Sequence, residues 1–289
     1  DDGSTDNTRK VVQNYIYRLQ TSDLRLKTKD KKEERIDKQQ PSNLRPQTKD
    51  IKQETRNKKT EKQNKILNPK IKYIYQSHKG VSKARNLGIA SSKGEFICFL
   101  DSDDRFRTGK LQITYNYIKR FPKHSIFHTE EIWYKKGKII SQKIYHKKPD
   151  RLILNKSVKL CCIGMSTSAI KKDAFNKIGL FDEAMPACED YDFWIRASLK
   201  FSFILIPEPF TMKEGGHPDQ QSKKYPAMDK LRIYSLQKIL NQKKLTPENY
   251  TIIYKELINK CNIYIKGAIK RNKTDEVDYY RKIIKEFDK

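Results

Sequence analysis

The sequence predicts an α/β protein, and three observations support that class. From residue 71 to about residue 210, short apolar segments with strand patterns alternate with segments whose apolar residues recur at helical spacing. From residue 225 onward, only helical patterns remain. The chain has 289 residues, enough for one large α/β domain or two small ones.

The chain begins with a turn-like segment, DDGSTDNT, at residues 1–8. Residues 9–19 follow with apolar residues at helical spacing, and the polar residues 5–7 can cap that helix. A turn normally connects two elements, yet the chain opens on Asp1 and not on a methionine. We therefore expect the sequence to be an N-terminally truncated fragment.

Residues 20–70 have a different composition, with 16 Lys and Arg against 8 Asp and Glu and no aromatic residue. Such a segment cannot bury enough apolar surface to offset the entropy lost on ordering it. We interpret it as a solvated, mostly disordered insertion, with a long exposed helix in part of it as the alternative.

Regular patterns resume with an alternating segment at residues 71–76, IKYIYQ, which predicts a strand. A turn at Gly80 and a stop near Gly94 then bound a predicted helix. GEFICFL, at 94–100, predicts the next strand.

The middle of the chain predicts a helix and a hairpin. Residues 108–121 carry a helical pattern, and Thr108 is the predicted cap. Residues 125–134 and 138–145 flank the turn KKGK, as the two strands of a hairpin do.

The remaining elements follow in order. Residues 165–183 predict a short strand, a helix and a loop, and residues 189–201 predict a helix whose first residues are acidic, as the helix dipole favours. FSFILIPEP, at 201–209, predicts a strand ended by its prolines. The predicted helices of the C-terminal part are 225–240, 246–271 and 275–287.

Composition restricts the function classes. The formal net charge is +27, which predicts attraction to polyanions: nucleic acid, an anionic membrane face or phosphorylated substrates. No segment approaches the roughly 18 to 20 consecutive apolar residues of a membrane-spanning helix. The five cysteines lack metal-like spacing, so we expect small buried side chains in a reducing cytosol and a cytoplasmic protein.

Three carboxylates, Asp101, Asp103 and Asp104, follow the apolar segment 96–100. Like charges at this spacing repel, and desolvation at a strand end increases the cost, so a divalent cation, a basic cluster or open water must lie there. Ligands of open α/β sheets bind beyond the carboxyl ends of strands, and Mg²⁺ and Mn²⁺ prefer oxygen ligands. Spacing alone leaves a metal site and a solvated turn as alternatives.

Three further stretches are each unremarkable alone: DDGSTD at 1–6, KGVSKARN at 79–86 and ACEDYDFW at 187–194. In this order, together with GEFICFLDSDD, they resemble the motifs of family 2 glycosyltransferases. The resemblance covers roughly residues 1–20 and 71–225. It implies a GT-A fold, a Rossmann-like mixed sheet flanked by helices, over residues 1–225 with the 20–70 insertion, followed by an α-helical C-terminal extension at 226–289.

The resemblance implies a site for a nucleotide-sugar donor. Asp2 matches the residue that hydrogen-bonds the base of the donor, and Asp1 lies beside it. Arg85 matches a donor-contacting position of the ARN motif. Asp101 matches the first aspartate of the DxD pair and is implied in both donor and metal binding.

The same resemblance implies metal and catalytic residues. Asp103 matches the second aspartate of the DxD pair and is the expected direct ligand of Mn²⁺ or Mg²⁺. His217 matches a downstream region that closes over the donor and touches the metal or the phosphates. Asp190 matches the catalytic base of inverting members, with Glu189 beside it; the base accepts the proton of the acceptor hydroxyl, and the metal stabilises the leaving diphosphate.

The implied reaction is transfer of a sugar, with inversion, from a nucleotide-diphosphate sugar to a hydroxyl of a glycan or lipid-linked acceptor in cell-envelope polysaccharide biosynthesis. Peripheral contact with an anionic membrane at its inner face is a further expectation, and a specific nucleic acid is not expected as a partner. Two features depart from the family pattern. The apolar strand that usually precedes DDGS is missing, and residues 20–70 stand where the family usually has a short connection.

Two other functions remain open from the sequence. The departures allow an inactive relative that binds nucleotide-sugar or a partner, which would show nucleotide binding without turnover. The charge and the Lys-rich run allow a basic nucleic-acid-binding protein, which would bind RNA with steep salt dependence.

Overall fold

The computed structural model describes residues 10, 71–216, 224–225, 227–242 and 244–288. The chain forms two compact units, residues 1–79 and 80–289. The predicted helix at 9–19, apart from Lys10, and the whole 20–70 segment lie outside the described residues. The fold described below is that of the second unit.

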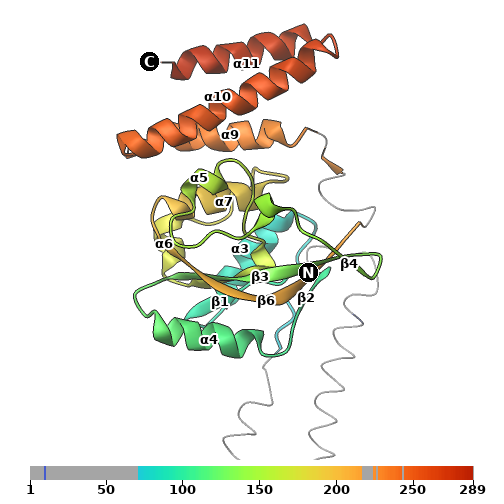
Figure 1. The fold of residues 1–289 in the computed structure, drawn as a ribbon, viewed down its shortest axis with the longest axis vertical. Coiled ribbons are helices and arrows are strands. Elements are labelled where there is room, and N and C mark those ends of the chain that lie inside the picture. Colours follow the sequence, from blue (N-terminus) through green and yellow to red (C-terminus); the bar gives the residue numbers. More distant parts are fainter. Residues whose placement is uncertain (1–9, 11–70, 217–223, 226, 243, 289) are drawn as a thin grey trace, which may run out of the picture. The chain divides into compact units, whose positions relative to one another are not determined.

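A six-stranded mixed sheet forms the centre of this unit, as Figure 1 shows. Its strand order is β1-β5-β3-β6-β2, with β4 paired to β3. β3 and β6 pair in parallel, and the other pairs are antiparallel. The strands are β1 Phe96–Cys98, β2 Asp104–Phe106, β3 Ile126–Lys135, β4 Lys138–Ile140, β5 Ser168–Lys171 and β6 Phe203–Gly215.

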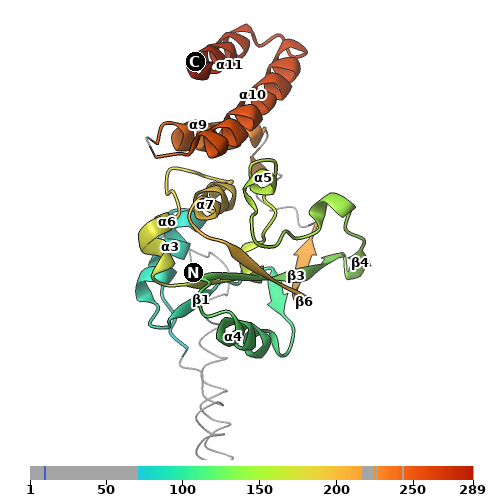
Figure 2. The same cartoon turned by 60° about the vertical axis from the view of Figure 1, so that its left-hand side comes forward.

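Helices cover both faces of the sheet (Figures 1 and 2). α4 lies on one face, and α3, α6 and α7 lie on the other. Two 3₁₀ turns, η1 and η2, and the short helix α5 lie in the connection between β4 and β5. The bounds are α3 Val81–Ser91, α4 Lys110–Arg120, η1 Ile144–His146, α5 Leu154–Ser157, η2 Met165–Thr167, α6 Ala174–Ile178 and α7 Glu189–Ser198.

The two-residue period of the strands divides the core between these faces. Ile126 of β3 packs with the cluster that includes Phe175 and Trp194, on the side of α6 and α7. The next residue, Phe127, packs with Tyr117 and its neighbours on α4. Consecutive apolar residues in β3 are therefore buried on opposite faces, as expected for a strand covered by helices on both sides.

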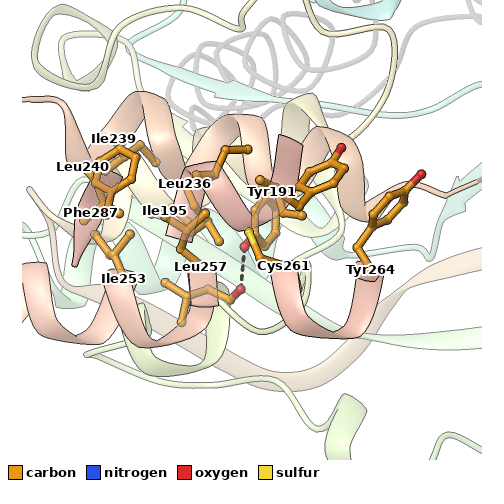
Figure 3. Close-up of a cluster of buried hydrophobic side chains, with 14 of the residues drawn as sticks. Tyr191, Ile195, Leu236, Ile239, Leu240, Ile253, Leu257, Cys261, Tyr264 and Phe287 are labelled. Carbon is orange, nitrogen blue, oxygen red and sulfur yellow. Dashed lines mark hydrogen bonds between the residues drawn. The ribbon is translucent and has the colours of Figure 1, made fainter. Parts of the chain in front are cut away.

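The helices α9 Asp229–Leu240, α10 Pro247–Ile269 and α11 Thr274–Phe287 form the C-terminal part. Their apolar residues share one core with α7, as Figure 3 shows for Tyr191 and Ile195 of α7 beside Leu236 and Leu257. The start of α10 follows from its sequence. Thr246 accepts the backbone N–H of Asn249, and Pro247 occupies the first helical position, where no N–H is needed.

The predicted mixed sheet flanked by helices, with helices at the C-terminal end, is confirmed. The predicted strand at 71–76 is wrong, because within that segment only Gln76 forms an isolated bridge. Alternating apolar residues favour extended backbone, but a strand also requires a neighbour that pairs along it.

Two further boundaries differ from the prediction for local reasons. β6 continues through Pro207 and Pro209 to Gly215, because its register against β3 shifts at this point and the prolines fall where ladder pairing is interrupted. Helix α4 begins at Lys110 after Gly109, which has φ of 88°, and Thr108 provides no side-chain cap.

Among the described residues, no helix has the length and apolar character needed to cross a membrane.

Candidate active site

Arg85 brings three of the sequence motifs together. Its Nη2 donates to Oδ1 of Asp101 at 2.8 Å, and its Nη1 donates to Oε1 of Glu189 at 2.6 Å. The Arg85 side chain is 12% exposed and that of Glu189 5%, so this pair lies largely out of water, whereas the Asp101 side chain is 33% exposed. The ARN, DSDD and EDYD segments therefore meet at one guanidinium.

Local structure places each of these three residues. Arg85 lies on α3, which starts after Gly80 at φ of 89°. Asp101 follows the end of β1, and its backbone N–H donates to Oγ of Ser166 at 3.0 Å. Glu189 is the first residue of α7, where the positive end of the helix dipole favours a carboxylate.

The neighbouring residue Asn86 fixes α3 against the segment that leads into α7. Its side-chain amide donates to the carbonyl of Phe181 at 2.9 Å, and its Oδ1 accepts the N–H of the same residue at 3.0 Å. The Phe181 ring also lies under the Arg85 guanidinium, 5.4 Å from ring centroid to Cζ. The ARN segment therefore supplies the positive charge of the cluster through Arg85 and fixes its position through Asn86.

Burial dominates the electrostatics of Glu189. Burial and, second, the negative charge of Asp190 raise the pKa of this carboxyl to about 7, although Arg85 acts in the opposite direction. Oε2 of Glu189 is buried and has no hydrogen-bond partner among the described residues. Burial lowers the pKa of Arg85, but Asp101 and Glu189 outweigh it, so the net shift is upward and the guanidinium stays charged.

Asp190 follows Glu189 in α7, and its side chain contacts Cys161. Its Oδ2 accepts a hydrogen bond from Sγ of Cys161 at 3.1 Å, and its Oδ1 accepts the backbone N–H of Tyr191 at 2.7 Å. Burial, followed by the charge of Asp190, raises the pKa of the Cys161 thiol well above its usual range, so the thiol keeps its proton. Cys161 is therefore the donor, and the Asp190 carboxylate is the acceptor.

The three aspartates that follow β1 point to different surroundings. Asp101 pairs with Arg85, and Asp103 is exposed. Asp104 is buried as the first residue of β2, where it lies opposite Lys213 of β6. Both oxygens of Asp104 lack hydrogen-bond partners among the described residues, and burial raises its pKa against the pull of Lys213.

Asp101 and Asp103 fit a divalent cation whose other ligands are substrate phosphates and water. In the described part of the chain, no group of three or more His, Cys, Asp or Glu could hold a metal ion on its own. Mg²⁺ commonly binds through one or two carboxylates together with substrate phosphates and water. An exposed Asp103 two residues after Asp101 matches that kind of site, and does not match a closed site built from protein ligands alone.

Three predicted site residues, Asp1, Asp2 and His217, lie outside the described residues. The structure brings Arg85, Asp101 and Glu189 together, places Asp190 next to Glu189, and leaves Asp103 in the exposed loop.

Sequence reasoning missed the residues that support Asp101 and Asp190. Lys110 is buried, and its Nζ donates to the carbonyl of Ser166 and to Oγ1 of Thr211, each at 2.8 Å. Burial lowers the pKa of Lys110 to about 8. Ser166 in turn accepts from Asp101, so Lys110 supports the acidic loop through the turn at η2. A lysine at the start of a helix is usually a surface residue, and Cys161 was expected only to fill the core. No pattern in the sequence therefore indicated a role in the site for either residue.

Comparison with known proteins matches part of the chain to one family. Residues 48–179 match the model of the family described as glycosyl transferase family 2. The amylovoran biosynthesis glycosyltransferase AmsB of Erwinia amylovora is 31% identical over 135 residues, which are 44% of this chain and 44% of that protein. WfgD of Escherichia coli, a UDP-Glc:alpha-D-GlcNAc-diphosphoundecaprenol beta-1,3-glucosyltransferase, is 28% identical over 123 residues, which are 40% of this chain and 44% of that protein.

The chain corresponds to only part of its relatives. It spans between 24% and 58% of the length of the uncharacterized Rickettsia glycosyltransferases that it matches. Among solved structures, S. aureus TarS 1–349 in complex with UDP-GlcNAc is similar, with a TM-score of 0.52, 15% sequence identity and coverage of 79% of each chain. At that identity the likeness concerns the fold.

Proposed function

Because residues 48–179 match the glycosyl transferase family 2 model, we propose that the chain transfers a sugar from a nucleotide-diphosphate sugar to an acceptor hydroxyl with inversion. The observation that carries this proposal is the pairing of Arg85 with both Asp101 and Glu189. This pairing puts the acidic loop that follows β1 beside the start of α7. A donor bound at that loop would have its anomeric carbon near the carboxylates of α7.

Asp190 is the proposed catalytic base. A base must accept the proton of the acceptor hydroxyl while that oxygen attacks the anomeric carbon. The Cys161 thiol donates to one oxygen of Asp190 and so orients this carboxylate. Glu189 pairs with Arg85 through one oxygen, so we assign it to positioning within the site.

A divalent cation, Mn²⁺ or Mg²⁺, is the proposed cofactor, held by Asp103 and Asp101 together with the diphosphate of the donor. When bound, it would stabilise the negative charge on the leaving diphosphate. His217 remains a proposed ligand from the downstream loop, and Asp1 and Asp2 remain proposed contacts to the donor base.

The proposed acceptor is a glycan or a lipid-linked sugar of cell-envelope polysaccharide biosynthesis, met at the cytoplasmic face of the membrane. The names of AmsB and WfgD support this class, since the first refers to amylovoran biosynthesis and the second to a diphosphoundecaprenol-linked acceptor.

The metal assignment is tested with Asp103→Asn, which removes a negative oxygen from the diphosphate–metal site while the residue stays exposed. Titration calorimetry with UDP and GDP, with and without Mn²⁺, should show metal-dependent binding by the wild type and at least about tenfold weaker binding by the variant. Asp278→Asn, an exposed aspartate on α11 with a side chain 78% exposed, is the matched control and should bind like the wild type.

Metal-independent affinity that is unchanged in Asp103→Asn would remove the metal assignment. Absence of binding to any nucleotide would remove the proposed donor class as a whole. Binding without turnover of any nucleotide-sugar would favour an inactive relative.

A further inference from the structure

The hairpin of β3 and β4 and the turn that follows it carry an unusual set of exposed apolar side chains. Ile139 is 67% exposed, Ile144 90%, Tyr145 51% and Ile140 37%. Single exposed apolar residues are common on protein surfaces, but four within seven positions form a local patch that requires a partner.

Lysines are in excess around this patch, and the acidic residue nearest to the turn is Glu214 of β6, which accepts from the backbone N–H of Gly137 at 3.4 Å. Residues 132–149 contain six lysines and no Asp or Glu. One of them, Lys148, is buried and pairs with Glu131 at 2.8 Å. The other five are exposed: Lys135, Lys136, Lys138, Lys143 and Lys147. We call these five lysines with Ile139, Ile140, Ile144 and Tyr145 the hairpin surface.

The inner side of the same segment is well fixed, so exposure of the isoleucines is not the result of a missing attachment. Gln142 donates to the carbonyl of Glu131 at 2.6 Å. The His146 ring contacts Trp133, with ring centroids 4.7 Å apart. The polar and aromatic side chains thus anchor the segment, while the aliphatic ones face outward.

The hairpin surface lies at the same end of the sheet as the candidate active site. β1 and β3 both pair antiparallel with β5, so they run in the same direction. The carboxyl end of β1 leads to Asp101, and the carboxyl end of β3 leads into the hairpin. A partner bound to the hairpin surface would therefore meet the protein at the end where the donor is expected.

From these observations we infer that the hairpin surface docks on an anionic lipid bilayer. Aliphatic side chains and a tyrosine can enter the interfacial layer, while lysines remain at the level of acidic headgroups. The excess of lysines over acidic residues in segment 132–149 favours such a surface over a protein partner, whose interfaces normally offer charges of both signs. Presentation of a lipid-linked acceptor by this docking rests on the proposed function, but the docking itself does not.

The test is cosedimentation of the full chain with vesicles of phosphatidylglycerol and phosphatidylcholine, and with vesicles of phosphatidylcholine alone. The wild type should prefer the anionic vesicles. The triple variant Lys136→Gln/Lys138→Gln/Lys143→Gln should bind them on the order of 100-fold more weakly, because each lysine near an anionic surface strengthens binding about fivefold. The triple variant Lys270→Gln/Lys282→Gln/Lys285→Gln removes the same charge from exposed positions directly after α10 and on α11, and should lose far less.

A second pair of variants tests the contribution of the apolar side chains to vesicle binding. Ile139→Ser/Ile144→Ser should weaken binding to anionic vesicles at least about tenfold, since two aliphatic side chains no longer leave water. Leu111→Ser/Tyr115→Ser removes two side chains of α4 that are 60% and 53% exposed, and should bind like the wild type. In a fluorescence version of the test, brominated lipids should quench the emission of the tryptophan introduced by Ile144→Trp. They should not quench that of the tryptophan introduced by Leu111→Trp.

Equal losses in the hairpin variants and their controls would overturn the inference, because binding would then reflect total charge. Self-association that Ile139→Ser/Ile144→Ser abolishes, without any preference for anionic vesicles, would also overturn it and would assign the surface to a second copy of the chain. Neither donor nor acceptor is present in these assays, so their outcome is independent of whether the chain transfers a sugar.

Discussion

Glu189 is the side chain in the candidate site whose charge depends most on the fold. It is buried, it lies next to Asp190, and one of its oxygens has no hydrogen-bond partner among the described residues. Burial and the neighbouring carboxylate raise its pKa to about 7, although Arg85 favours the charged form. Folding therefore favours the protonated acid over a pH range in which the unfolded chain is ionised.

This shift predicts a pH dependence of stability. The stabilising contribution of Glu189 is fully present below about pH 4.5, its ordinary pKa, and is lost as the pH rises through about 7. Between about pH 5 and pH 8, the wild type should lose up to about 3 kcal/mol of unfolding free energy relative to Glu189→Gln, whose amide does not titrate. Urea unfolding of both proteins across this range measures the difference, in which titrating groups that do not interact with Glu189 cancel. Parallel curves would show that Glu189 titrates normally in the folded chain.

The sequence could name the residues of the site but not the contacts that set their chemistry. Arg85, Asp101 and Glu189 belong to recognisable motifs, and the structure joins them through hydrogen bonds that the motifs themselves did not indicate. The hydrogen bond from Cys161 to Asp190 joins residues 29 positions apart, and neither has a local pattern that indicates the other. Such contacts depend on how loops cross in space, which spacing along the chain does not encode.

At the scale of elements, apolar pattern predicted helices better than strands. α4, α7 and α10 lie within a few residues of their predicted positions, because helical spacing is a property of the segment itself. Strands depend on neighbours, so the alternating residues 71–76 form no regular strand, and β2 appears at Asp104–Phe106 where an acidic loop was expected. The register shift opposite the prolines of β6 could likewise be known only from the pairing with β3.

The attachment of α3 predicts a stability difference between two asparagines. Asn86→Ala leaves the buried N–H and carbonyl of Phe181 without their side-chain partners, which should lower the free energy of unfolding by about 2 to 4 kcal/mol. Asn116→Ala on α4 removes an exposed amide whose partner is Gln112, and should change stability by less than about 0.5 kcal/mol. Chemical denaturation of both variants makes the comparison, and similar small losses would show that Asn86 does not hold α3 in place.

At the scale of the whole described unit, the C-terminal helices pack with α7 in a hydrophobic cluster that is separate from those of the sheet. Tyr191 and Ile195 are buried within the cluster that includes Ile239, Ile253 and Leu257 (Figure 3). We propose that residues 226–289 form an extension that stabilises α7, and with it the carboxylates at the start of that helix.

Two residues of α10 test this role. Leu257 is fully buried against α7 and α9, so Leu257→Ala should cost about 2 to 5 kcal/mol of unfolding free energy. Ile263 on the same helix is 54% exposed, so Ile263→Ala should stay within about 0.5 kcal/mol of the wild type. The measurement is a single urea transition followed by both far-ultraviolet circular dichroism and tryptophan fluorescence. Trp194 lies on α7, so a fluorescence transition that Leu257→Ala leaves unchanged would contradict the stabilisation of α7 by α10.

The central claim is that the start of α7 carries the catalytic base of a nucleotide-sugar-dependent transferase. Asp190→Asn is nearly isosteric, and the amide can still accept from Cys161, but it cannot take the proton of an acceptor hydroxyl. Removal of a general base typically lowers the rate by about 10²- to 10⁴-fold. The affinity for the donor should stay near that of the wild type, because the base faces the acceptor oxygen and not the nucleotide.

The most direct measurement is therefore the turnover and the donor Kd of the wild type and of Asp190→Asn on the same preparations. Release of the nucleoside diphosphate from UDP-GlcNAc, UDP-glucose and GDP-mannose, with Mn²⁺ present, gives the rate, and calorimetry gives the Kd. We predict a fall in kcat of about 10²- to 10⁴-fold with a nearly unchanged Kd. If Asp190 served only to start the helix, asparagine would replace it without loss, and near-wild-type transfer by Asp190→Asn would contradict the account.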